Sequence, residues 1–212
     1  GVAALIAPAL GKAAMKIGEL IMLATNLQPF LMGIVVSVLV GAALTLPISS
    51  AAICAAFGLT GLAGGAAVAG CCAQMIGFAV MSFKENGWGG LVSQGIGTSM
   101  LQMGNIIKNP RIWIAPIVTS AITGPVATCL FKLQMNGTAV SSGMGTCGFV
   151  GQIGVYSGWV NDVAAGTKSA ITMMDWAGLI LISFVLPAVI CPFINWLLKK
   201  AGWVKDGDMK LQ

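Results

Sequence analysis

Four apolar runs, each near the length that a helix needs to cross a membrane, constrain this chain most strongly. They cover residues 30–46, 62–83, 112–131 and 176–198. A helix of about 20 apolar residues spans the hydrocarbon core of a bilayer. Hydrophobic residues make up 57% of the chain and charged residues only 8%, whereas soluble domains carry roughly 25% charged residues. We therefore expect an all-α integral membrane protein, with residues 1–212 as a single membrane domain of about four spanning helices.

The first apolar run contains a break. Pro29 stands near its first turn, and Pro47 interrupts it before a second stretch, residues 51–60, of only half a spanning length. Pro47 indicates either a broken helix, whose freed backbone groups can bind polar ligands, or a kink repaired by neighbouring helices. We assign residues 29–83 and 112–131 to spans and residues 176–198 to the last span.

Residues 11–26 are predicted to form an N-terminal amphipathic helix lying on the membrane surface. Lys12, Lys16 and Glu19 share one helical face, as expected for an interfacial helix. The alternative is a tilted spanning helix whose lysines extend toward water. Because the chain begins at Gly1 inside an apolar run, we also expect an upstream portion to be missing.

Two polar, glycine-rich stretches, residues 87–109 and 138–160, are candidates for re-entrant hairpin segments. Neither has the apolar run of a spanning helix. At membrane depth, irregular polar backbone is tolerated only where it is buried in protein or lines a cavity. In the second stretch, Gly145, Gly148, Gly151 and Gly154 recur every third residue and offer a surface for close backbone packing. We expect residues 87–105 and 143–154 to face each other around one polar cavity near mid-membrane.

The candidate solute-binding side chains are amides, hydroxyls and one carboxylate, which suit the hydroxyl groups of a neutral sugar. For each residue the alternative is an interhelical hydrogen bond, worth roughly 0.6 kcal/mol in membranes. Glu85 either enters the cavity or pairs with Lys84 or Lys108 at the surface. The substrate-binding candidates are Glu85, Gln94, Ser99, Gln102, Asn105, Thr146, Gln152 and Ser49.

The charges predict an orientation rather than a nucleic-acid partner. The net charge of +5 comes from lysines and arginine at segment ends, and cytoplasmic loops carry an excess of such residues. The basic tail, residues 199–212, should therefore be cytoplasmic, in a multi-pass protein of the cell's inner (cytoplasmic) membrane. Lys84, Lys108 and Arg111 fall on the same side, and Lys132 and Lys168 lie outside with Asp162 and Asp175.

The cysteines and the absence of histidine argue against metal or redox chemistry. The six cysteines form no CxxC pair, and all but Cys147 lie in clearly apolar segments. Zinc sites need clustered cysteine and histidine ligands, and buried cysteine behaves as a small apolar residue. We expect no metal site, no cofactor and no self-contained catalytic centre.

Several motifs resemble the PfoR-like branch of the phosphotransferase-system sugar permeases (EIIC). The resemblance runs from about residue 15 to about residue 158. It rests on Leu27-Gln28-Pro29-Phe30-Leu31-Met32-Gly33-Ile34, Leu46-Pro47-Ile48-Ser49-Ser50, Gly58-Leu59-Thr60-Gly61-Leu62-Ala63, Asn105-Ile106-Ile107-Lys108-Asn109-Pro110-Arg111 and Ser142-Gly143-Met144-Gly145-Thr146-Cys147-Gly148-Phe149-Val150-Gly151.

The resemblance implies an all-helical, dimeric permease whose re-entrant hairpins hold a sugar. The chain departs from well-studied sugar permeases because it has no histidine, and Glu85 is the only acidic residue near a polar membrane motif. The family's phosphorylated domains are also absent, so separate phosphocarrier proteins would be partners. A permease component is the leading hypothesis; the alternatives are a PfoR-type membrane sensor that binds without transport, and a channel.

Overall fold

The structure, a computed structural model, describes residues 2–211, with the side chains of residues 11, 12 and 15–211. Within this part the chain is helical, and one isolated bridge pairs Gly61 with Met135. The longer helices are α1 (Val2–Thr25), α2 (Pro29–Thr45), α4 (Gly61–Met81), α7 (Ile114–Pro125), α9 (Val150–Ala164) and α11 (Leu186–Lys200). The shorter ones are α3 (Ser50–Ala56), α5 (Phe83–Val92), η1 (Ser93–Gly97), η2 (Ser99–Gln102), α6 (Met103–Lys108), η3 (Pro110–Trp113), η4 (Val126–Leu130), α8 (Ala139–Ser142), η5 (Cys147–Phe149), α10 (Met173–Ile180) and η6 (Leu181–Val185).

Three helices of the described chain are long and apolar enough to cross a membrane. They are Gly61–Met81, the continuous η3–α7–η4 helix Pro110–Leu130, and the α10–η6–α11 helix Met173–Lys200. The fourth expected span is α2, which is apolar but has 17 residues and is therefore about 25 Å long. The expected all-α membrane fold is confirmed.

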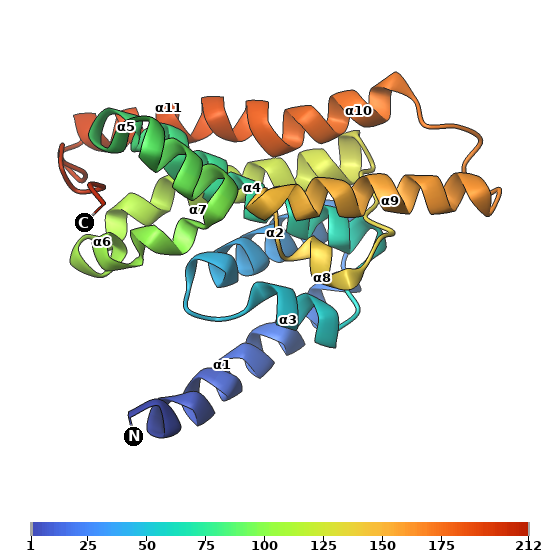
Figure 1. Ribbon diagram of the computed structural model, residues 1–212, viewed down its shortest axis with the longest axis horizontal. Coiled ribbons are helices and arrows are strands. Elements are labelled where there is room, and N and C mark those ends of the chain that lie inside the picture. The colour runs from blue at the N-terminus through green and yellow to red at the C-terminus, as the bar shows by residue number, and fades with distance from the viewer. Residues whose placement is uncertain (1, 212) are drawn as a thin grey trace.

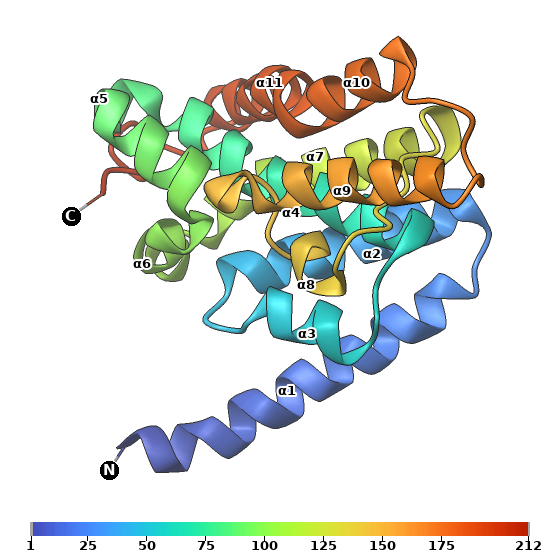
Figure 2. The same cartoon turned by 45° about the vertical axis from the view of Figure 1, so that its right-hand side comes forward.

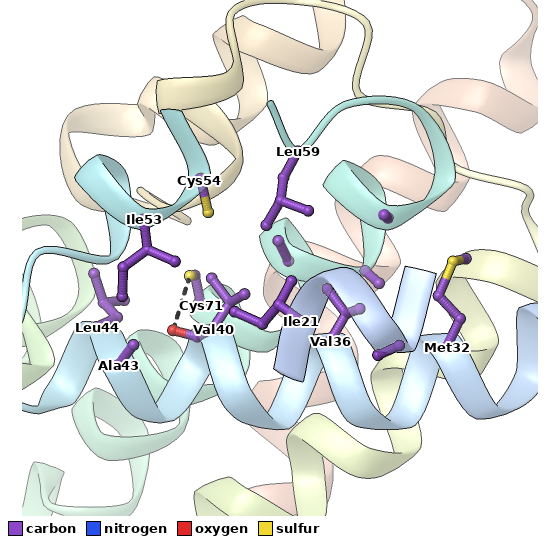
Figure 3. Packing of buried hydrophobic residues seen from close by; sticks show 14 of the residues in the cluster. Ile21, Met32, Val36, Val40, Ala43, Leu44, Ile53, Cys54, Leu59 and Cys71 are labelled. Atoms are coloured by element: carbon purple, nitrogen blue, oxygen red, sulfur yellow. Dashed lines mark hydrogen bonds between the residues drawn. The ribbon is translucent and has the colours of Figure 1, made fainter. Parts of the chain in front are cut away.

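Helix α4 forms the centre of the bundle, with α2, α7 and α11 packed around it (Figure 1). Almost all of its side chains are buried. Gly70 allows the close approach of α2, because a Cβ atom there would collide with the backbone of Ser37. Figure 3 shows the neighbouring apolar cluster, in which the Cys71 thiol points toward the carbonyl oxygen of Val40 at 3.9 Å. Small residues thus replace the bulky core of a soluble bundle.

The first apolar run enters the bundle and turns back. Helix α2 begins where the Thr128 hydroxyl donates to the Pro29 carbonyl oxygen, and its end reaches Gln74, midway along α4, through Thr45. The break at Pro47 follows, and α3 returns the chain to Gly61, which is paired with Met135. The segment therefore starts and finishes at the same end of the bundle, called here the connector end because it holds residues 131–138.

Two helical hairpins occupy the regions of the predicted re-entrant segments. The tail-end hairpin, residues 83–108, follows α4 and returns to η3 at the end of the bundle that holds the C-terminal residues 199–211. The connector-end hairpin, residues 132–164, runs from the connector end through α8 to η5 and returns along α9 (Figure 2). Their placement within a membrane stays a prediction, but their opposite points of entry follow from the chain path.

Helix α1 extends away from the rest of the bundle (Figures 1 and 2). Lys12, Lys16 and Glu19 are exposed, while Ile21 and Ala24 are buried in the cluster that includes α2 and α3. One side of α1 thus packs on the bundle, and its exposed side carries both these charges and the apolar residues Met15, Leu20 and Leu23. Its position on a membrane surface stays a prediction.

Candidate functional site

A ladder of buried amides runs along the inside of the tail-end hairpin. The Gln94 Nε2 donates to the Ser82 hydroxyl at 2.9 Å, and the Gln102 Nε2 donates to Gln94 Oε1 at 2.8 Å. The Asn105 Nδ2 then donates to Gln102 Oε1 at 2.8 Å. Gln94 and Gln102 are fully buried and Asn105 is 8% exposed. These three predicted residues are thus brought together, and they face protein rather than lipid.

The C-terminal tail completes this ladder with its backbone. Gln102 and Asn105 donate to the carbonyl oxygens of Met209 and Lys210, at 3.0 and 3.1 Å. The Asn86 amide donates to the Met209 carbonyl oxygen and accepts from the Leu211 N–H, each at 2.8 Å. Such pairing removes the penalty of burying unsatisfied amides. The tail, expected only to set topology, is therefore part of the polar interior.

Glu85 holds the tail instead of entering a cavity at the hairpin tips. Its Oε2 accepts from the Met209 N–H at 2.9 Å, and its Oε1 lies 3.8 Å from the Lys199 ammonium. The carboxylate thus pairs with Lys199, and not with either lysine suggested by the sequence. Its position in the first turn of α5 also places negative charge at a helix N-terminus, which is favourable.

A second polar cluster lies beside the tip of the tail-end hairpin. The hydroxyl oxygens of Ser99 and Thr45 are 2.8 Å apart. Gln74, fully buried in α4, accepts from Thr45 at 3.2 Å and from the Trp113 indole at 2.9 Å. Ser99 thus connects the hairpin to the centre of the bundle.

The two hairpins meet at their tips, as the sequence predicts. The Thr146 hydroxyl donates to the Gly95 carbonyl oxygen at 2.6 Å. The adjacent cavity, about 220 Å³, is lined by apolar residues that include Ile76, Ile96 and Phe149. The expected polar cavity is therefore replaced here by an apolar one, because the polar side chains of the hairpin turn inward and pair with one another and with the tail.

The remaining predicted site residues lie apart from the amide ladder. Gln152 on α9 donates to the Ser183 hydroxyl at 3.0 Å, and its buried Oε1 has no partner among the described residues. Ser49 caps α3 by accepting from the Ala52 N–H, and it is exposed. Of the predicted set, Ser49 has the plainest local role, that of a helix cap.

Sequence reasoning missed Gln74, Ser82 and Asn86. Gln74 had a usable signal, because an amide inside a glycine- and alanine-rich span must find a buried partner. Ser82 and Asn86 lie at the join between α4 and α5, where polar residues are ordinary. Only the tertiary contacts with Gln94 and the tail reveal their part in the network.

The fold and the buried network define a helical membrane protein with interior groups arranged for hydrogen bonding. The sequence model of the family described as "Phosphotransferase system, EIIC" matches residues 1–211, and the chain belongs to this family. It is thus a membrane component of a sugar permease of the phosphotransferase system. Comparison with curated proteins and with solved structures gives no match.

Proposed function

We propose that this chain binds and translocates a small polar solute of the sugar class where its two hairpins meet. The observation that carries this proposal is the Thr146–Gly95 hydrogen bond, which joins hairpins entering from opposite ends of the bundle. Discontinuous segments near mid-membrane are where transporters hold their substrates. Because one hairpin lies on each side of the Thr146–Gly95 contact, each hairpin can serve as a gate toward one face of the membrane.

The proposed binding groups are buried polar side chains of the two hairpins. Gln94, Gln102 and Asn105 form one side, with amides that can both donate to and accept from sugar hydroxyls. Thr146 and Ser99 contribute hydroxyls, and the unpaired Oε1 of Gln152 adds an acceptor. In this proposal Glu85 serves to dock the tail, because its Oε2 accepts from the N–H of Met209, the residue to which Gln102 donates. Ser49 lies apart from these groups and caps a helix.

In this proposal, the structure with the tail docked on the hairpin is the closed state of the site. Gln102 and Asn105 donate to tail carbonyl oxygens, so a solute must replace these bonds or leave them intact and bind nearer the tips. Replacement balances one set of hydrogen bonds against another, which keeps the energetic difference between the two states small. The tail thus acts as the closing element on its side of the membrane.

The wider setting is also proposed. The basic tail favours a cytoplasmic C-terminus in a multi-pass protein of the cytoplasmic membrane. The resemblance to the PfoR-like branch supports a homodimer whose interface uses apolar spans and leaves both hairpins free. The family's place in the phosphotransferase system supports phosphocarrier proteins as partners.

Uptake of radiolabelled sugars into proteoliposomes, with and without added phosphocarrier proteins, tests the proposal. Gln102→Leu should abolish uptake, because it removes the central amide of the ladder. Gln28→Leu removes an amide at the exposed start of α2 and should leave uptake unchanged. Equal uptake by both variants, or no sugar uptake by the wild type, would contradict the proposal.

A membrane sensor is the second candidate function. One observation favours it: the hairpin and the tail share hydrogen bonds through Asn86 and Gln102, so solute binding would change the tail's position. Sugar binding without flux, together with a stable cytoplasmic partner recovered on the tail, would support a sensor over a permease.

A further inference from the structure

We propose that a second solute site lies at the connector end and takes a neutral polyhydroxylated molecule. A cavity of about 530 Å³ opens there between residues 131–136, the last turns of α9 and the first turn of α10. This volume lies within the range of about 300–1,000 Å³ that is typical of ligand pockets. That the solute visits this cavity before the hairpins rests on the proposed function, whereas the binding itself does not.

The walls of the cavity are fixed by hydrogen bonds that do not need a ligand. The Asn136 Nδ2 donates to Asp162 Oδ2 at 2.7 Å, which ties the connector to α9. The Lys168 ammonium lies 2.6 Å from Asp175 Oδ1, and Asp175 also forms a capping box with Thr172 at the start of α10. A pocket with preset walls loses little conformational freedom on binding.

The charges of the cavity select a neutral ligand. Its lining contains two lysines, Lys132 and Lys168, and two aspartates, Asp162 and Asp175. The four formal charges cancel, so an anion gains no net attraction and meets two carboxylates. Carboxylates, ammonium groups and the nearby amides instead offer both acceptors and donors to hydroxyl groups.

The lining also contains apolar surface, contributed mainly by Met174, which is 63% exposed, since Trp159 is only 3% exposed. Trp159 and Met174 line the cavity. The Trp159 ring is held by the Lys168 ammonium, 5.6 Å from its centre, and by the edge-to-face ring of Trp176. Apolar surface beside paired charges is the mixture of apolar and oriented polar groups that ligand pockets show.

The position of the cavity suits capture from outside. Phe131 and Lys132 follow the span Pro110–Leu130, whose other end lies where Asn109 bonds to Asp208 of the tail. The cavity and the tail are therefore at opposite ends of that span. With the tail in the cytoplasm, the cavity opens to the outer face.

Protection of a single introduced cysteine tests this site directly. Gln134→Cys places a thiol in the exposed lining, in a Cys129→Ser background that removes an exposed native thiol. With the protein in lipid nanodiscs, the rate of maleimide labelling is measured against glucose, sorbitol and glucose 6-phosphate. We expect glucose or sorbitol to slow labelling in a saturable way, and glucose 6-phosphate to be at least tenfold less effective.

Matched variants separate the cavity from general effects. Lys168→Met and Asp162→Asn should each weaken protection about tenfold, since each loses a charged hydrogen-bonding group; the second keeps the side-chain shape and so guards against a folding failure of the first. Lys200→Met removes a lysine 5.5 Å from the Trp196 ring, outside the cavity, and should change nothing. No protection in the wild type, equal protection in all variants, or stronger protection by the phosphorylated sugar would overturn the inference.

The same variants distinguish this inference from the proposed function. Gln102→Leu should retain cavity protection while losing uptake. Protection without uptake in the wild type would leave the cavity site standing and reject the permease. Uptake by the wild type without protection would support the permease and reject the cavity site.

Discussion

The Thr146 hydroxyl and the Gly95 carbonyl oxygen, 51 residues apart in the chain, lie 2.6 Å from each other. Thr146 is fully buried at the tip of the connector-end hairpin, and Gly95 is buried near the tip of the tail-end hairpin. Their bond closes the gap between two segments that enter from opposite ends. The predictions below test this contact and the structure around it.

Removing the tip contact should loosen the hairpins without unfolding the bundle. Thr146→Val keeps the shape but leaves the Gly95 carbonyl oxygen unpaired, which should cost about 1–3 kcal/mol. Thermal unfolding in detergent measures the loss. Thr25→Val removes a hydroxyl that bonds only within α1, to the Met22 carbonyl oxygen, and should have a much smaller effect; equal losses in the two variants would argue against a special role for the tips.

Breaking the amide ladder should release the tail. Gln102→Leu leaves Gln94 Oε1 without its donor and removes one of the two amide donors to the Met209 carbonyl oxygen. Limited trypsin digestion at Lys205 and Lys210 should therefore accelerate severalfold. The digestion rate in nanodiscs is the measurement, and Gln28→Leu is the control. An unchanged rate would show that the other tail contacts, through Glu85 and Asn86, hold it without the ladder.

Close packing of α2 and α4 should make Gly70 intolerant of a side chain. Gly70→Ala places a methyl group against the Ser37 backbone, and an overpacked core costs about 1–3 kcal/mol or more. Gly104→Ala, in open space on α6, should instead be neutral or stabilising by up to about 1 kcal/mol. Folded yield and thermal midpoint compare the two; a stable Gly70→Ala protein would contradict the packing.

The Lys199–Asp206 ion pair should give the tail a weak dependence on pH. The hydrogen bond from Lys199 lowers the pKa of Asp206. A lowered folded-state pKa gives stabilisation that is present above the unfolded value, about 3.9, and is lost as the pH falls through the folded value. The difference in thermal midpoint between wild type and Asp206→Asn should therefore be small at pH 7 and should shrink as the pH falls below about 3.9. Glu19→Gln on α1 serves as the control, and 0.5 M salt should shrink the pH 7 difference because the pair is exposed.

Labelling of introduced cysteines should place the cavity and the tail on opposite faces. In sealed right-side-out vesicles, Gln134→Cys should react with a membrane-impermeant maleimide, while Lys210→Cys should react only after permeabilisation. Ready reaction of the tail residue from outside would reverse the orientation proposed from the basic tail.

The spans and both hairpins could be predicted from the sequence, because hydropathy and the penalty on polar backbone in lipid act locally. The long apolar runs around Gly61–Met81, Pro110–Leu130 and Met173–Lys200 leave few folds other than a membrane helix bundle. The amides of Gln94, Gln102 and Asn105 had to be buried in protein for the same reason.

Only the tertiary structure decided which partners these polar groups take. Nothing local in the sequence pairs Asn105 with the Lys210 carbonyl oxygen, or Glu85 with Lys199, since these contacts depend on where the last span delivers the tail. The charge-balanced cavity likewise arises because Lys132, Asp162 and Asp175 come from three separate elements. Hydropathy determined where this chain must be helical and buried, and three-dimensional packing decided which side chains meet.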